Sequence, residues 1–148
     1  TGEYERLVDQ TVKEVFHVLF QNRELLLLFN DMIAKAIEFQ SDYGVPEEFA
    51  ELFNENGTLK RKPIPRWVQR AVFFRDRGRC VLCDKDLSGT INFENIENYD
   101  HIVPLARYGL NDVTNIQLLC KECNQVEKHA GMPSTSNMYQ SWYKYDET

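Results

Sequence analysis

Hydrophobic positions at helical spacing dominate the first third of the chain. Between residues 4 and 20 they recur every three or four positions, which predicts an amphipathic helix. Asn22 is a suitable N-cap for a second helix that runs to about Phe39. The predicted buried face of the first helix is Val8, Val12, Val15, Phe16 and Leu19, and that of the second is Leu25, Leu28, Phe29, Met32, Ile33, Ala36 and Ile37.

The pattern then changes to shorter elements. After a break at residues 41–44, Pro46 suits the first turn of a short helix over residues 47–53. Residues 60–65 form a basic connector interrupted by prolines, which do not continue a helix. Residues 66–77 predict a third helix that alternates between a buried side and a solvated side.

Turns and short elements make up the second half of the chain. Residues 99–103 predict a strand that ends at Pro104, and residues 116–119 predict a second short strand. A helix is expected to begin at Cys120 and to close at Gly131. The tail carries Met138, Tyr139, Trp142, Tyr143 and Tyr145, which we interpret as a packed flap rather than a base-stacking platform.

These elements suggest two regions, a helical N-terminal subdomain at residues 1–57 and a second domain at residues 58–148 with an aromatic C-terminal tail. The N-terminal region shows no catalytic constellation, so we interpret it as structural support or as a partner interface. We find no secretory signal. The longest apolar run, residues 25–29, is too short to span a bilayer, so we expect no membrane segment.

Charge is distributed unevenly. The net charge of −6 conceals an acidic region at residues 1–56, with four Lys and Arg against twelve Asp and Glu. Residues 60–79 carry eight basic residues against one acidic residue. A solvated helix face would explain this stripe, but a stripe that neutralises DNA phosphates is the sharper hypothesis. Its candidate contacts are Arg66, Arg70, Arg75, Arg77 and Arg79.

The four cysteines form two CxxC pairs, Cys80 with Cys83 and Cys120 with Cys123. Without a secretory signal, this spacing indicates metal ligation before disulfides, and we expect a reducing cytoplasm. Four thiolates satisfy tetrahedral Zn²⁺ and leave no open position for water. We therefore predict a structural zinc site that contributes to folding and not to catalysis.

Asp100 and His101 lie between the two cysteine pairs. A carboxylate suits Mg²⁺ or Mn²⁺, and an imidazole titrates near neutral pH. Together they could hold a cation against a phosphodiester and activate water for attack. Neighbouring residues on a regular strand point to opposite faces, so both can serve one centre only if the strand twists or ends there.

These motifs occur in a specific order across residues 64–130. The run from Arg66 to Cys83, then Tyr99-Asp100-His101-Ile102-Val103-Pro104-Leu105, then the stretch from Gly109 to Asn124, resembles the HNH endonuclease family. More narrowly, it resembles the bacterial and phage type with a four-cysteine zinc. The resemblance implies an α+β, treble-clef-like ββα-metal fold, in which two strands and a helix surround one catalytic cation.

The resemblance also implies a role for each motif residue. His101 would be the general base, Asp100 a ligand of the catalytic cation, and Asn115 the residue that holds the loop so that His101 is oriented. Asn124 takes the position that is often His, which makes the chain an H-N-N variant. Asn124 still offers a carbonyl oxygen, with His129 as the alternative ligand. Arg107 is a further candidate phosphate contact.

The function implied is metal-dependent hydrolysis of DNA phosphodiesters, by nicking or double-strand cleavage, leaving 5′-phosphate ends. Phage defence, restriction or a mobile element would be the setting. The alternative is a catalytically inactive, zinc-stabilised module that binds DNA or protein. A further hypothesis is that the acidic N-terminal helices bind a protein partner. A homodimer is the other form of association that the sequence allows.

Overall fold

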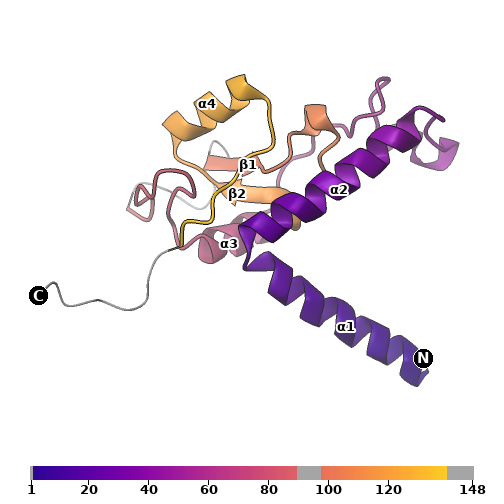
Figure 1. Cartoon of the computed structure of the whole chain (residues 1–148), viewed down its shortest axis with the longest axis horizontal. Coiled ribbons are helices and arrows are strands. Elements are labelled where there is room, and N and C mark those ends of the chain that lie inside the picture. Colours follow the sequence, from indigo (N-terminus) through magenta and orange to yellow (C-terminus); the bar gives the residue numbers. More distant parts are fainter. Residues whose placement is uncertain (1, 90–97, 140–148) are drawn as a thin grey trace, which may run out of the picture.

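The computed structural model describes residues 2–89 and 98–139, without the side chains of Lys128 and His129. The chain is α+β, as predicted, with helices around a two-stranded sheet (Figure 1). With η for a 3-10 helix, the main elements are α1 (Glu3–Phe20), α2 (Arg23–Ser41), η1 (Glu47–Leu52), α3 (Arg66–Arg75), β1 (Tyr99–His101), η3 (Leu105–Arg107), η4 (Val113–Asn115), β2 (Ile116–Leu118) and α4 (Lys121–Ala130).

The sheet lies between α4 on one side and α3 on the other (Figure 1). β1 and β2 are antiparallel, and the register pairs Asp100 with Gln117. The first cysteine loop joins the far edge of β2, because the Val81 amide donates to the Leu118 carbonyl at 3.0 Å. The core around the sheet contains Phe20, Val68, Val72, Val81, Leu87, Tyr99, Val113, Ile116, Leu118 and Leu119.

β1 is shorter than the predicted strand, because it ends at His101. The Ile102 amide still donates to the Asn115 carbonyl at 2.8 Å, but the Val103 amide is taken by the Asn115 side chain at 2.9 Å. A side chain has therefore replaced the backbone partner that a continuing strand needs. The strand stops at the residue that carries the candidate base.

Helix α2 begins after Asn22, whose side chain caps it as predicted, but its buried face was predicted wrongly. Leu26, Asn30 and Ala34 face inward, whereas Leu28 and Met32 are more than 60% exposed. The buried amide of Asn30 donates to the Thr114 carbonyl at 3.0 Å. The hydrophobic pattern alone predicts that Asn30 lies outside the core. Its burial is possible because the Thr114 carbonyl, distant in sequence, accepts a hydrogen bond from its side chain.

A buried ion cluster joins the N-terminal helices to the sheet. Asp76 accepts from Nε and Nη2 of Arg75 at 2.8 Å and from Arg23 at 3.4 Å, and it also accepts from the Leu118 amide at 3.0 Å. The Asp76 side chain is fully buried, and the Arg75 guanidinium lies 4.9 Å from the Phe20 ring centre. Helix α2 is thereby fixed to α3 and β2 through charged side chains.

Helix α1 runs away from the rest of the molecule (Figure 1). Among its residues, Phe20 alone is buried, while Leu7, Val12 and Val18 are exposed. The predicted apolar stripe therefore exists, but little of it packs on the protein's own core. Within the described residues, none of the helices is both long enough and apolar enough to cross a bilayer.

The segment after α4 crosses back over the sheet. The Ser134 amide donates to the Ile102 carbonyl at 3.0 Å, and the Arg23 amide donates to the Tyr139 hydroxyl at 2.9 Å. Arg23 also lies over the Tyr139 ring, 4.4 Å from its centre. This part of the tail is packed against the body. The other predicted tail aromatics, Trp142, Tyr143 and Tyr145, lie outside the described residues.

Candidate metal centre and catalytic cleft

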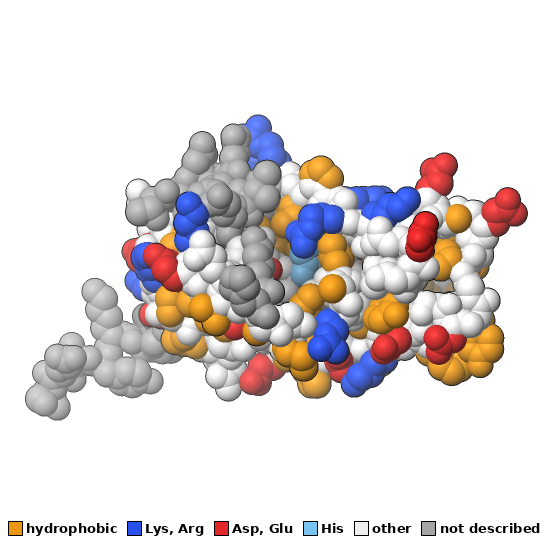
Figure 2. Space-filling view, turned by 90° about the horizontal axis from the view of Figure 1, so that it is seen from above, with side chains coloured by type: hydrophobic (Ala, Val, Ile, Leu, Met, Phe, Trp, Pro, Cys, Tyr) orange, Lys and Arg blue, Asp and Glu red, His pale blue; other side chains and the backbone are white. Residues whose placement is uncertain are grey.

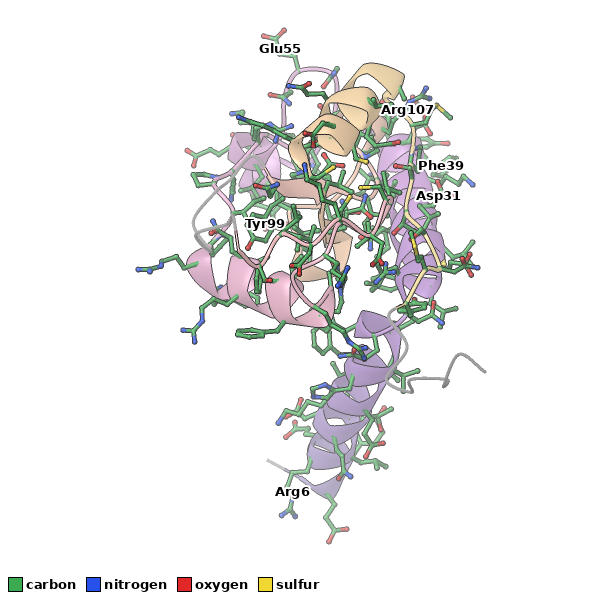
Figure 3. The ribbon with its side chains drawn as sticks, turned by 90° about the vertical axis from the view of Figure 1, so that its left-hand side faces the viewer. Arg6, Asp31, Phe39, Glu55, Tyr99 and Arg107 are labelled. Atoms are coloured by element: carbon green, nitrogen blue, oxygen red, sulfur yellow. The ribbon has the colours of Figure 1, made fainter. Side chains whose placement is uncertain are left out.

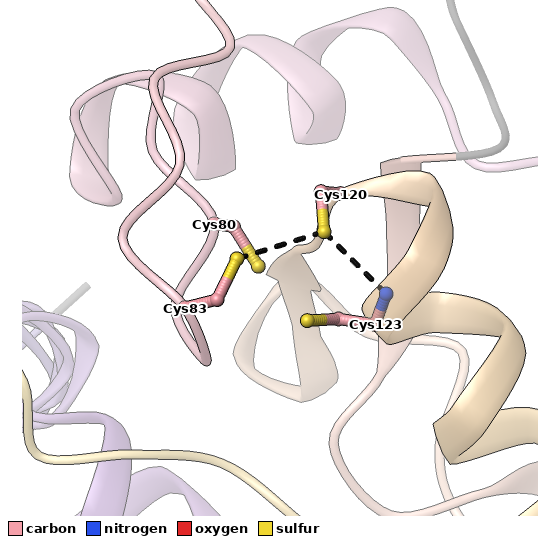
Figure 4. A group of neighbouring side chains, drawn as sticks. All are labelled: Cys80, Cys83, Cys120 and Cys123. Atoms are coloured by element: carbon pink, nitrogen blue, oxygen red, sulfur yellow. Dashed lines mark hydrogen bonds between the residues drawn. The ribbon is translucent and has the colours of Figure 1, made fainter.

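The two cysteine pairs converge on one point between the first loop and the start of α4 (Figure 4). All four sulfur atoms lie within 4.8 Å of one another, and the Sγ atoms of Cys83 and Cys120 are 3.7 Å apart. A disulfide would bring two sulfurs to about 2.05 Å. Tetrahedral Zn–S bonds of about 2.3 Å would instead place sulfurs about 3.8 Å apart. The four cysteines therefore fit a structural zinc ion.

Local backbone geometry builds both halves of this centre. The Cys80 amide donates to the Lys85 carbonyl at 3.0 Å, and Asp84 turns the loop with a left-handed φ of +62°. On the other side, Cys120 is the N-cap of α4, and its Sγ accepts from the Cys123 amide at 3.4 Å. Burial raises the pKa of the Cys120 thiol to about 11, so a bound cation must displace its proton.

A cavity of about 180 Å³ lies at the end of β1. Asp100 and His101 both line it, together with Glu127 and Arg61. The strand ends at His101, so the two neighbouring side chains can border one space although they alternate along β1. The cavity therefore combines two carboxylates, one imidazole and one guanidinium.

His101 is buried, with 5% of its surface exposed. Burial lowers its pKa to about 4, the positive charge of Arg61 acts in the same direction, and a hydrogen bond with Asn111 opposes them. The imidazole is therefore neutral at pH 7. Its Nε2 atom has no hydrogen-bond partner within the described part of the chain. A neutral ring with a nitrogen that makes no hydrogen bond is the form that can accept a proton.

Asn115 fixes the loop that follows His101. Its side-chain oxygen accepts from the Val103 amide, and its nitrogen donates to the carbonyls of Val103 and Leu110, each at 2.9 Å. Asn115 is fully buried, so no water competes for these bonds. One side chain thus holds both ends of the loop between β1 and η4.

The same loop contains a close backbone approach at Gly109. A Cβ atom at this position would lie 1.9 Å from the Val103 carbonyl oxygen, far inside contact distance. The Gly109 amide donates to the Pro104 carbonyl at 3.1 Å, which closes the loop around η3. Only glycine fits here without moving the segment that follows His101.

Residues 80–139 match the family model described as HNH endonuclease. This part of the chain is similar to the HNH endonuclease family. Neither the curated proteins nor the solved structures gave a significant match to the chain. The matched range covers both cysteine pairs, β1, β2 and α4, so the similarity coincides with the four-cysteine centre and with most of the cavity described above.

The matched region also contains hard oxygen donors. Asp100 and Glu127 line the same cavity, and the buried Asn124 lies one turn before Glu127 on α4. Carboxylate oxygens are suitable ligands for Mg²⁺ or Mn²⁺, and Asp100 and Glu127 supply them here, whereas Asn124 is not among the residues that line the cavity. The side chain of His129, the alternative ligand, lies outside the described residues.

The arginines predicted to contact DNA lie in three different places. Arg66, Arg70 and Arg77 are exposed on or just after α3. Arg79 contacts Asp84 in the first cysteine loop, at 3.5 Å. Arg75 points into the core, where Asp76 and the Ile116 carbonyl occupy its guanidinium. Arg75 is therefore on no surface that DNA could reach, and its assignment as a DNA contact was wrong.

Arg107 lies beside the end of α4 (Figure 3). Its Nε donates to the Gly131 carbonyl at 3.3 Å, and Nη2 contacts the Met132 sulfur at 3.1 Å. The arginine therefore braces the chain around the cavity. It remains exposed.

Two residues of the cavity were missed from the sequence. Glu127 lies three positions after Asn124, so the two share one face of α4, and this spacing was a usable signal. Arg61 lies in the basic connector, and no periodicity in the sequence marks which of the connector's charges borders the cavity. In Figure 2 a histidine side chain is visible in the middle of the face, with Lys and Arg side chains close to it.

Proposed function

We propose that the region similar to the HNH family is a metal-dependent endonuclease that hydrolyses DNA phosphodiester bonds, by nicking or double-strand cleavage. The observation that supports this most is the shared cavity of His101, Asp100 and Glu127. A base with an available nitrogen and hard cation ligands meet there, next to a zinc scaffold and within the range of the family match.

His101 would accept a proton from a water molecule in the cavity, through its Nε2 atom. Asn115 would keep the imidazole in place, because it fixes the loop directly after it. Arg61 would attract the phosphate, since its positive charge borders the same space. A divalent ion on Asp100 and Asn124, with Glu127 beside them, would polarise the phosphodiester and stabilise the leaving oxygen.

Plasmid nicking in Mg²⁺ or Mn²⁺ tests the proposal. We expect His101→Ala and Asp100→Ala each to lower the nicking rate at least about 100-fold, the first by loss of the general base and the second by loss of a cation ligand. The exposed residues His17 and Asp9 on α1 give the matched controls His17→Ala and Asp9→Ala, which should cut like the parent. Equal cutting by all four variants would reject the assignment.

The second cation has its own test. Replacing Glu127 by Gln or Asn124 by Ala should raise the Mg²⁺ concentration needed for half-maximal nicking, because each change removes or weakens an oxygen donor. Binding of Mn²⁺, followed by electron paramagnetic resonance, should weaken in parallel. A change in nicking without a change in Mn²⁺ binding would assign these residues to the substrate instead.

Two observations favour the alternative function, an inactive zinc-stabilised module that binds DNA or protein. His101 is 5% exposed, and the motif position after Cys123 holds Asn124 rather than His. This alternative predicts DNA binding that needs no divalent cation, and no cleavage at any protein concentration. The nicking assay above separates the two. Phage defence, restriction and residence in the cytoplasm stay predictions.

We also propose that α1 binds a protein partner or a second copy of the chain. It presents Leu7, Val12 and Val18 to solvent beside the acidic residues Glu5 and Asp9. Exposed apolar stripes of this kind mark interaction sites. Deleting residues 1–15 should abolish assembly and leave nicking intact. Deleting all of 1–56 would be uninformative, because α2 carries Arg23 of the buried ion cluster.

A further inference from the structure

Helix α3 presents aromatic and basic side chains together on its outer face. Its inner face is Val68, Val72 and Arg75, which are buried against the sheet. On the outer face, Trp67 and Phe74 are each 63% exposed, and Arg70 lies between them. The buried core contacts of α3 come from the opposite side of the helix.

Helical geometry places these outer residues on a single surface. Trp67, Arg70 and Phe74 follow the i, i+3, i+7 spacing, which aligns them along one side of α3 over about 10 Å. Arg66 and Arg77, both exposed, extend the positive charge beyond each end. The Phe74 ring stands at 89° to the Phe73 ring, with centroids 5.8 Å apart, so a neighbour supports it. Figure 3 shows this helix at the side of the body, with side chains reaching outward.

The outer face of α3 adjoins a cavity that His101, the candidate base, also lines. Trp67 lines a cavity of about 140 Å³ whose other walls include Lys62, Asn111 and His101. His101 therefore borders two spaces, one shared with the carboxylates and one shared with Trp67. A strand that lies along α3 would thus reach the imidazole from the Trp67 end.

We propose that the outer face of α3 binds unpaired nucleotides, with bases stacked on Trp67 and Phe74 and phosphates paired with its arginines. The positive charge of the arginines favours a polyanion such as a nucleic acid. The two flat apolar rings favour contact with the faces of bases, and these faces are accessible in a single strand but are stacked on one another in a duplex. Combined with the proposed nuclease function, on which this step rests, the inference has a consequence for the substrate. The preferred substrate carries a single-stranded segment such as an overhang, flap or gap.

Binding without added divalent cation tests the inference separately from catalysis. Fluorescence anisotropy would compare the full chain on a single-stranded oligonucleotide and on its duplex. We expect tighter binding of the single strand. Trp67→Ala and Phe74→Ala should each weaken binding of the single strand roughly tenfold, because each removes the ring on which one base stacks. The same variants should change binding of the duplex by less than about twofold. Phe39, which is also 63% exposed but lies on α2, gives the matched control Phe39→Ala, expected to bind like the parent.

Two further readouts separate stacking from charge. Arg70→Gln should weaken both ligands and reduce the salt dependence of binding by about one phosphate contact. The chain has two tryptophans, so in a Trp142→Phe background the emission of Trp67 reports on base contact, and single-stranded DNA should quench it. This signal does not depend on removing either of the proposed stacking residues, Trp67 and Phe74. No quenching, or aromatic variants that bind single strands like the parent, would overturn the inference.

The outcomes also distinguish this inference from the nuclease proposal. Single-strand binding that depends on Trp67 and Phe74, without cleavage of any DNA, would keep the inference and reject the proposed activity. Cleavage at equal rates on duplex and on flapped substrates, unaffected by the aromatic variants, would keep the activity and reject the inference.

Discussion

At the scale of single residues, Asn115 makes the most specific contribution to the site. It is buried and forms three side-chain hydrogen bonds, each at 2.9 Å, around the loop after His101. Asn115→Ala leaves buried backbone groups without partners, which should cost about 3 kcal/mol of unfolding free energy and lower the nicking rate. Chemical denaturation measures the first effect. The exposed Asn54 provides the control, because Asn54→Ala should cost less than about 1 kcal/mol. Similar losses in both variants would contradict the role given to Asn115.

His101 should make folding stability depend on pH. Burial first, and then the charge of Arg61, lower its pKa to about 4, while the unfolded chain keeps a value near 6.5. Between these values the unfolded state binds the proton first, so stability is fully present above pH 6.5 and is lost as pH falls toward 4. The total loss is about 3 kcal/mol. His101→Gln should flatten the slope of unfolding free energy against pH. The quantity to compare is the difference between variant and parent, because the zinc-binding cysteines take up protons in both proteins. Identical slopes would show that burial does not hold the imidazole neutral.

Residue identities were therefore more predictable from the sequence than residue environments. The cysteine spacing was sufficient to predict the metal centre, since two CxxC pairs in one short chain are typical of a bound zinc ion. Arg75 and Asn30 show the limit. Both are polar residues in helices, and both are buried because backbone carbonyls distant in sequence, those of Ile116 and Thr114, accept their hydrogen bonds. No local pattern contains that information.

At the scale of elements, helix existence followed from periodicity, but helix orientation did not. The apolar residues of α2 surround most of its circumference, so several faces could have been buried. The buried ion cluster and Asn30 select the face that is observed, and they leave Leu28 and Met32 exposed. Strand β1 ends early for a related reason, because the Asn115 side chain takes the next backbone partner.

The ion cluster should be the strongest single link between α2, α3 and β2. Asp76→Asn leaves the buried guanidiniums of Arg23 and Arg75 without a counter-charge, which should cost about 3 to 5 kcal/mol. Thermal or urea unfolding measures it. The exposed pair of Asp31 and Lys35, 2.7 Å apart, is the comparison, since Asp31→Asn should change stability by less than about 0.5 kcal/mol. A small effect of Asp76→Asn would mean that water enters the cluster and screens it.

At the scale of the whole molecule, the two proposed ions have separate roles: zinc would stabilise the fold, and the divalent cation would take part in catalysis. The zinc centre joins the first cysteine loop to α4, and α4 carries Glu127 to the cavity. Loss of zinc should therefore remove the cavity as well as the scaffold. Apparent binding free energies of structural zinc, about 10 to 16 kcal/mol, match or exceed the stability of a typical domain.

Selective removal of the two ions tests this division. We expect about one zinc per chain by elemental analysis, and we expect its chelation to abolish the cooperative melting transition seen by circular dichroism. Omission of Mg²⁺ should instead stop nicking and leave that transition in place, because Asp100 and Glu127 only border a cavity that the zinc scaffold holds. Adding Mg²⁺ to chelated protein should restore neither property. A chelated protein that still melts cooperatively and cuts DNA would show that the four thiols hold the fold together without a metal.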